Sequence, residues 1–169
     1  MVNGHVYGGA IGLIASCDLA VMAEEGTFGF PEPRMGMVAT TAAIPLLRKV
    51  GRTAAAELLL TGRRYGADHA AAIGLVNKAV ASADLDGAVT EYLDDLRRCG
   101  PEALALCKEL LDRLPRLDPP YAEQLTIEMS AQVAASEEAA EGQLARRSQR
   151  PPSWYAGPDP APTPAQPEE

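Results

Sequence analysis

The sequence predicts an α/β fold in which a short strand-and-helix beginning is followed by a long series of helices. The first forty residues are rich in glycine and β-branched residues, which favour tight turns and short strands. From about residue 41 to residue 150, alanine, leucine, glutamate and arginine dominate, and apolar residues recur at helical spacing. With 169 residues, 47% of them hydrophobic, the chain is long enough for one core-bearing domain.

The beginning of the chain alternates short extended segments with one helix. Residues 8–17 start with two glycines and continue as an apolar run, which predicts a helix entered through glycine. Residues 19–22 and 27–30 are short and apolar, and we expect a strand in each. Pro31 ends the second strand because proline has no N–H to donate to a sheet, and a loop follows as far as Met37.

Glycines and prolines divide the remainder into helices. Gly51 ends the first of them, and Gly62 can adopt the left-handed conformation that ends the second. Pro101 and Pro120 stand where helices begin, since the missing N–H costs least in the first turn. Residues 75–80 are the last expected strand. The expected helices cover residues 42–50, 53–61, 68–73, 85–98, 101–114, 120–134 and 137–147.

The C-terminal segment differs in composition from everything before it. Residues 157–169 contain five prolines, two terminal glutamates and no large apolar side chain. Such a segment cannot bury enough apolar surface to offset its chain entropy. We therefore expect a disordered, proline-rich tail over residues 155–169.

Composition also excludes several classes of function. The net charge is −8 and the 15 lysines and arginines are scattered, which argues against a nucleic-acid or anionic-membrane surface. The three cysteines have no metal-ligand spacing and no disulfide framework, so we expect no metal and a cytoplasmic location. The apolar run 10–16 is broken by Gly12 and is too short to span a bilayer.

Gly8 and Gly9 form a candidate anion-binding corner. Glycine lets a ligand approach the backbone closely, and a helix N-terminus presents N–H groups without intrahelical partners and a partial positive charge. On its own, such a pair is more often only a tight turn. The segments around it change that interpretation. They are residues 2–13, 16–20, 28–36, 58–62, 72–77, 100–103 and 136–142, together with Arg150 and Trp154.

Taken together, these segments resemble the signature of the enoyl-CoA hydratase/isomerase (crotonase) family over residues 1 to about 154. The resemblance implies a crotonase-type α/β fold, with the C-terminal portion of a ββα spiral core at 1–80 and a helical trimerisation region at 81–154. It also implies a homotrimer or a dimer of trimers, that is, a hexamer. Family members carry a further N-terminal stretch, with a second oxyanion donor and much of the CoA-binding surface, and we expect this chain to lack that part.

The resemblance assigns site residues as well. It implies that the Gly9 N–H is one donor of an oxyanion hole, that Glu32 is the catalytic acid/base, and that Gly8, Gly12 and Pro31 border the substrate. By itself, Glu32 would be interpreted as a solvated loop glutamate; the surrounding motif reverses that preference. The implied partner is an acyl-CoA thioester, with CoA as part of the substrate and no metal or redox cofactor.

Gly12 departs from the family pattern. Hydratases of the two-carboxylate type carry a second glutamate at this position, whereas isomerases of the family move a proton with one. We expect an enoyl-CoA hydratase-type lyase of fatty acid metabolism that acts through a stabilised enolate. The alternatives are a Δ3-Δ2-enoyl-CoA isomerase with a single glutamate and a non-catalytic acyl-CoA-binding or assembly subunit. Hydration should be slow, and Gly12→Glu should raise it.

Three further features are interpreted more plainly. His5 matches no catalytic position of the family and is expected to be a packed or capping residue. Cys17 lies in an apolar stretch and is expected to be a small core residue. Residues 144–147 contain no aromatic side chain, although the resemblance implies one there, so an acyl-chain or subunit contact is expected to be altered.

Overall fold

In the computed structural model, which describes residues 1–155 and 157, five short strands form two small sheets. In the first sheet, β3 (Thr27–Gly29) lies between β1 (Val6–Tyr7) and β4 (Arg64–Gly66). β1 runs parallel to β3, and β4 runs antiparallel to it. The second sheet pairs β2 (Val21–Ala23) with β5 (Lys78–Val80) in parallel. The strands expected near 19–22, 27–30 and 75–80 are present, each shorter than expected, and β4 was not expected.

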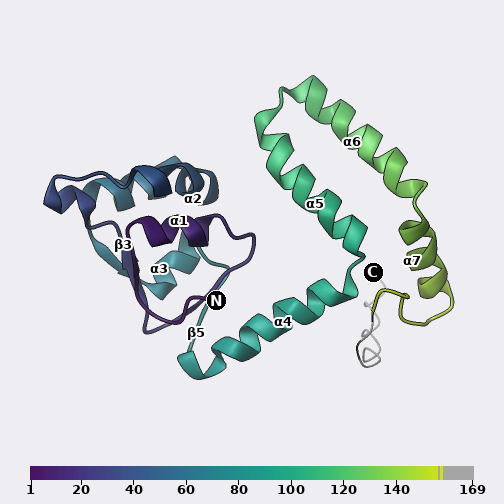
Figure 1. The fold of residues 1–169 in the computed structure, drawn as a ribbon, viewed down its shortest axis with the longest axis horizontal. Helices are drawn as coiled ribbons and strands as arrows, with labels where there is room; N and C mark the ends of the chain where they lie inside the picture. Colours follow the sequence, from purple (N-terminus) through teal and green to yellow (C-terminus); the bar gives the residue numbers. More distant parts are fainter. Residues whose placement is uncertain (156, 158–169) are drawn as a thin grey trace, which may run out of the picture. The chain divides into compact units, whose positions relative to one another are not determined.

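Helices cover these sheets in the first part of the chain, and α1 packs directly against α2 (Figure 1). Gly51 has φ 73°, a conformation that does not belong to an α-helix, so the two helices expected on either side of it are one helix with a kink. The loop after β3 contains a 3-10 helix. The elements are α1 (Gly9–Ala15), η1 (Glu32–Met35), α2 (Thr40–Thr61), α3 (Ala67–Ala72) and η2 (Ser82–Asp84).

The core of this part joins both sheets to the helices. Phe28 and Phe30, from β3 and the residue that follows it, have no solvent exposure, and neither do Ile11 of α1 and Leu46 and Leu58 of α2. Each of these burials contributes about 1.5–3 kcal/mol. Because α1 and α2 are fixed on this core, the residues at their N-termini have defined positions.

The Cys17 side chain does not belong to this core. Cys17 is exposed, and its Sγ donates a hydrogen bond to the carbonyl oxygen of Leu13 at 3.3 Å. The expectation of a small core residue was wrong, because α1 ends at Ala15 and the chain has already left the apolar face of the helix.

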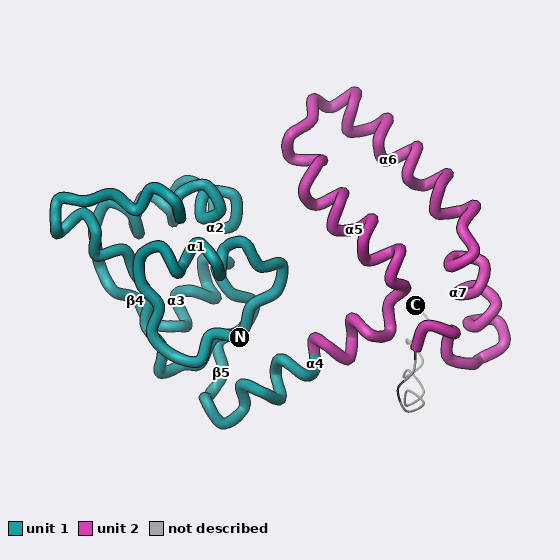
Figure 2. The backbone as a smooth tube through the Cα atoms, in the orientation of Figure 1, with its two compact units in different colours: residues 1–91 teal, residues 92–169 magenta. Residues whose placement is uncertain are grey.

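The chain divides into two units, residues 1–91 and residues 92–169, and the division lies within α4 (Leu85–Arg98) (Figure 2). The boundary expected near residue 80 precedes that helix. The tail expected over 155–169 falls outside the described residues, apart from positions 155 and 157. Within the described part of the chain, no helix is long and apolar enough to cross a membrane.

The second unit is helical, and its helices lie within a residue of the expected bounds. Few apolar side chains are buried in it; Leu125, Met129 and Ala145 are the buried ones among its described residues. Polar contacts therefore matter more here than in the first unit. The elements are the end of α4, α5 (Pro101–Arg113), η3 (Leu114–Arg116), α6 (Pro119–Ala134) and α7 (Glu137–Arg147).

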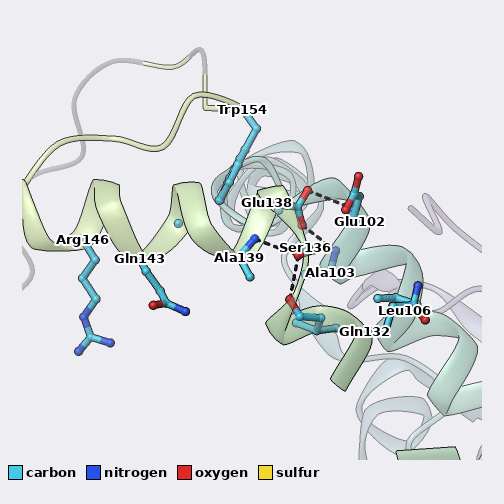
Figure 3. Close-up of a pocket in the computed structure, with 13 residues that line it drawn as sticks. Glu102, Ala103, Leu106, Gln132, Ser136, Glu138, Ala139, Gln143, Arg146 and Trp154 are labelled. Atoms are coloured by element: carbon cyan, nitrogen blue, oxygen red, sulfur yellow. Dashed lines mark hydrogen bonds between the residues drawn. The ribbon is translucent and has the colours of Figure 1, made fainter. Parts of the chain in front are cut away.

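The Glu138 carboxylate of α7 caps the start of α5. The N–H groups of Glu102 and Ala103 donate to its two oxygens at 2.9 and 2.8 Å (Figure 3). A Cβ on Gly100 would collide with this carboxylate, so the glycine leaves the space that the cap needs. The cap supplies acceptors to two of the N–H groups that every helix start leaves without an intrahelical partner.

Glu141 holds the chain that follows α7. The Arg150 guanidinium donates to both carboxylate oxygens of Glu141, at 2.7 and 2.8 Å, and the Ser153 N–H donates to one of them at 2.8 Å. Trp154 Nε1 donates to the Arg98 carbonyl oxygen at 3.2 Å. We call these four residues, 141, 150, 153 and 154, the C-terminal latch. The Arg150 hydrogen bonds, followed by that of Ser153, lower the pKa of Glu141 from 4.5 to about 2.

Acid is expected to open the C-terminal latch. Because the pKa of Glu141 is depressed in the folded chain, its stabilising effect is complete above pH 4.5 and is lost as the pH falls toward 2. Trp154 is the single tryptophan of the sequence, so its fluorescence reports on the latch. Glu141→Gln should show the opened-latch emission already at neutral pH and lose the acid transition. Glu109→Gln, which removes an ion pair with Arg113 within α5, is the control and should keep it.

Candidate active site

The turn between β1 and α1 has a backbone that only glycine adopts easily. Gly8 has φ 59° and ψ −135°, and its N–H donates to the Gly29 carbonyl oxygen of β3 at 3.1 Å. Gly9 is the first residue of α1, so its N–H has no intrahelical acceptor, and the residue is exposed. The predicted corner therefore exists, with a buried glycine that makes the turn and an accessible glycine that offers a donor.

Glu32 is brought to this corner from η1. Its carboxylate occupies the space where a side chain on Gly8 would begin: a Cβ built there would collide with Oε1 and lie 3.3 Å from Cδ. The Oε2 atom of Glu32 is buried and has no hydrogen-bond partner, the sole such side-chain atom in the described residues. Buried polar atoms without partners are rare, and they are found where a ligand or a proton is to be bound.

Gly8→Ala is expected to be strongly destabilising and to displace Glu32. A non-glycine residue in such a conformation costs about 1–3 kcal/mol, and here the new methyl group would also collide with the Glu32 carboxylate. The matched control is Gly36→Ala, since Gly36 has φ 71° and open space around its Cβ position. Urea unfolding should show a larger loss for Gly8→Ala than for Gly36→Ala. Equal losses would mean that the Glu32 carboxylate does not lie against Gly8.

Thr41 is a site neighbour that the sequence did not indicate. A Cβ on Gly9 would lie 3.7 Å from Thr41 Oγ1, so the first turn of α2 borders the corner. Thr41 belongs to an element more than thirty residues further along the chain, in a stretch without a motif. The contact became visible only when the packing of α1 on α2 was known.

Gly12 lies where α1 meets α2. It is buried, and a Cβ built on it would lie 3.0 Å from Ala42 Cα and 3.2 Å from Ala42 Cβ. The close approach of the two helices therefore depends on the absence of a side chain at position 12. Its contact with substrate stays a prediction. The same holds for Pro31, which precedes η1 with φ −72° and is half-buried.

A cavity in the second unit contains none of the predicted site residues. It has a volume of about 390 Å³ and is lined by residues of α5, α6 and α7 together with Trp154 (Figure 3). Its carboxylate from Glu138 already accepts two backbone hydrogen bonds. Arg146, from the stretch without an aromatic residue, also lines it. Within the described residues, no cluster of three or more His, Cys, Asp or Glu side chains could hold a metal ion.

Comparison with known proteins agrees with the sequence motifs. The profile of the family described as Enoyl-CoA hydratase/isomerase matches residues 1–157. A protein of Thermus thermophilus that carries the provisional name enoyl-CoA hydratase is 36% identical over 153 residues, which are 90% of this chain and 60% of that protein. Carnitinyl-CoA dehydratase of Escherichia coli K12 is 32% identical over 158 residues, with the same coverage. The chain thus spans about 60% of the length of these relatives.

The fold leads to the same family. The structure of Pseudomonas aeruginosa AtuE superposes with a TM-score of 0.86 and 34% identity, over 90% of this chain and 59% of that one. The expected crotonase-type α/β fold is thereby confirmed. With the family profile covering nearly all of its length, the chain belongs to the enoyl-CoA hydratase/isomerase family.

Proposed function

We propose that this chain takes part in acyl-CoA chemistry of the enoyl-CoA hydratase type, with the Gly9 N–H holding a thioester oxyanion and Glu32 moving the proton. The observation that supports this most is the buried, unpartnered Oε2 of Glu32 against the Gly8–Gly9 turn. A carboxylate without a partner can accept a proton from carbon, and a donor held at the helix start can stabilise the charge that appears on oxygen. One such donor is worth about 2.7–4 kcal/mol in the transition state.

The proton transfer is self-contained for isomerisation. Glu32 accepts a proton from C4 or C2 of an enoyl thioester, the carbonyl oxygen takes up negative charge beside Gly9, and Glu32 returns the proton to the other carbon. Hydration also needs a water molecule to be oriented and deprotonated while C2 is protonated. With no side chain at Gly12, Glu32 would have to serve both ends. This observation makes the Δ3-Δ2-enoyl-CoA isomerase the second candidate.

The decisive assay compares two substrates on the purified chain. Loss of the conjugated enone absorbance of crotonyl-CoA measures hydration, and gain of that absorbance from a 3-enoyl-CoA measures isomerisation. Faster hydration supports the hydratase, and faster isomerisation supports the isomerase. Tight binding of either thioester without turnover would instead support the non-catalytic acyl-CoA-binding subunit.

Assembly is the second property that we propose. The helices from α4 onward expose Leu93, Leu96, Leu111 and Ile127, and this unit has few buried apolar residues to stabilise it alone. We expect a homotrimer or a dimer of trimers, in which these side chains lie between subunits. Light scattering at micromolar concentration should show it, and a monodisperse monomer would contradict it. Removal of residues 157–169 should leave the assembly unchanged.

We further propose a cytoplasmic location for the protein. Cys17, Cys99 and Cys107 are all free thiols and all exposed. Exposed thiols persist in a reducing compartment, whereas an oxidising one would favour their pairing between molecules.

A further inference from the structure

A chain of hydrogen bonds runs between β1 and β3 just before the Gly8–Gly9 turn. The Tyr7 hydroxyl is hydrogen-bonded to Thr27 Oγ1. The Thr27 Oγ1 lies 3.0 Å from His5 Nδ1, and the Thr27 N–H donates to the same Nδ1 at 3.2 Å. Three residues that matched no position of the family signature as catalytic groups are thus joined in one network.

The backbone donor fixes the direction of every bond in this network. An amide N–H can only donate, so His5 Nδ1 must be an unprotonated acceptor. The Thr27 hydroxyl must then donate its proton to Nδ1, which leaves its oxygen to accept from the Tyr7 hydroxyl. The imidazole proton is consequently on Nε2. Each hydroxyl has one donor role and uses it within the network.

These bonds join positions that set the register of β1 on β3. Val6 lies opposite Phe28 and Tyr7 opposite Gly29, and the Gly8 N–H continues the same ladder by donating to Gly29. β1 has only two residues, so backbone pairing alone holds it weakly. A slip of one residue would move the following glycines by about 3.3 Å.

Arg64 of β4 supports the network from the other side of the sheet. Its guanidinium carbon lies 5.2 Å from the centre of the Tyr7 ring, within the range of a cation–π contact. β4 pairs with β3 and places Arg64 opposite Gly29. The Tyr7 ring is therefore held by contacts from β3 and β4 while its own strand leads into the turn.

We propose that His5, Thr27 and Tyr7 act as positioning residues, which fix the register of β1 and thereby aim the Gly9 N–H at the thioester oxygen. The inference rests on the oxyanion role proposed above for Gly9. None of the three side chains needs to touch the substrate. Their effect passes through the Gly8 hydrogen bond to Gly29, which joins the network to the turn.

Two measurements on Thr27→Val test the proposal. The first is the amide hydrogen exchange of Gly8 by NMR, which reports the β1–β3 pairing without any substrate. The second is the ultraviolet enolate band of bound acetoacetyl-CoA, which reports stabilisation of negative charge on the thioester side. Since a displacement of about 1 Å can cost about 10²-fold in rate, we expect exchange about tenfold faster and an enolate fraction about tenfold smaller.

Conservative variants separate positioning from folding. Thr27→Ser keeps the hydroxyl and should restore both readouts, and His5→Asn, which places an amide oxygen near the Nδ1 position, should restore most of them. Thr90→Val is the matched control, because the Thr90 hydroxyl bonds only to Asp86 of its own helix. It should change neither readout, and circular dichroism should be native in all variants.

The outcomes distinguish this inference from the proposed function. Unchanged Gly8 exchange and an unchanged enolate band in Thr27→Val would overturn the inference, as would a Thr27→Ser chain that behaves like Thr27→Val. A wild-type chain that binds acetoacetyl-CoA without any enolate band would contradict the oxyanion role of Gly9 instead. In that case Gly8 exchange alone would decide whether the network sets the register.

Discussion

Glu32→Gln is expected to lower the turnover of enoyl-CoA thioesters by about 10²–10⁴-fold, the usual contribution of a general acid or base. The amide keeps the shape of the carboxylate but cannot accept and return a proton. Thioester binding should therefore remain nearly unchanged, so the loss should appear in kcat rather than in KM. Steady-state kinetics with crotonyl-CoA and a 3-enoyl-CoA measure both parameters.

The control for this prediction is Glu24→Gln, in the exposed turn between β2 and β3. It makes the same chemical change outside the site and should leave kcat within a factor of about two, as surface substitutions usually do. More than half of the activity surviving in Glu32→Gln would show that another group moves the proton.

Gly12→Glu is expected to lower the stability of the fold when it is introduced alone. Its Cβ would lie 3.0 Å from Ala42 Cα, and the helices α1 and α2 would have to separate to admit it. Overpacking of this kind costs about 1–3 kcal/mol, and burial of a carboxylate adds to the loss. The expected gain in hydration therefore acquires a structural condition that the sequence did not reveal.

The double variant Gly12→Glu/Ala42→Gly supplies that condition. Removal of the Ala42 methyl group, 3.2 Å from the new Cβ, should restore part of the stability. Urea unfolding measures the non-additivity of the pair, and we expect the double variant to be more stable than the sum of the single effects predicts. Hydration that stays unchanged in the folded double variant would mean that a group other than a second carboxylate activates water.

Local signals were sufficient for the helices of the second unit. Prolines at the first helical positions and Ser136 as an N-cap, whose hydroxyl accepts from the Ala139 N–H, fix where those helices begin. Gly51 was found as a break for the same reason, since its φ of 73° suits glycine alone. Strand β4 was missed because Arg64–Gly66 has no apolar alternation and is held by pairing with a distant strand.

The site could be predicted only in part. The motif around Glu32 and Gly9 identified both residues, and the structure shows that Glu32 lies against the Gly8 turn. The unpartnered Oε2, the neighbouring Thr41 and the contact of Gly12 with Ala42 depend on elements far apart in the sequence. No local pattern encodes such contacts, because they arise when α1 packs on α2.

The cap that Glu138 provides for α5 has a consequence for synthesis on the ribosome. The bond from the Glu102 N–H spans 36 residues, so α5 emerges with its first turn incomplete and waits for α6 and α7. Closing a segment of this length costs chain entropy before the two hydrogen bonds form. The second unit should therefore become ordered late and all at once, and a nascent chain that stops before Glu138 should have a frayed, protease-sensitive start of α5.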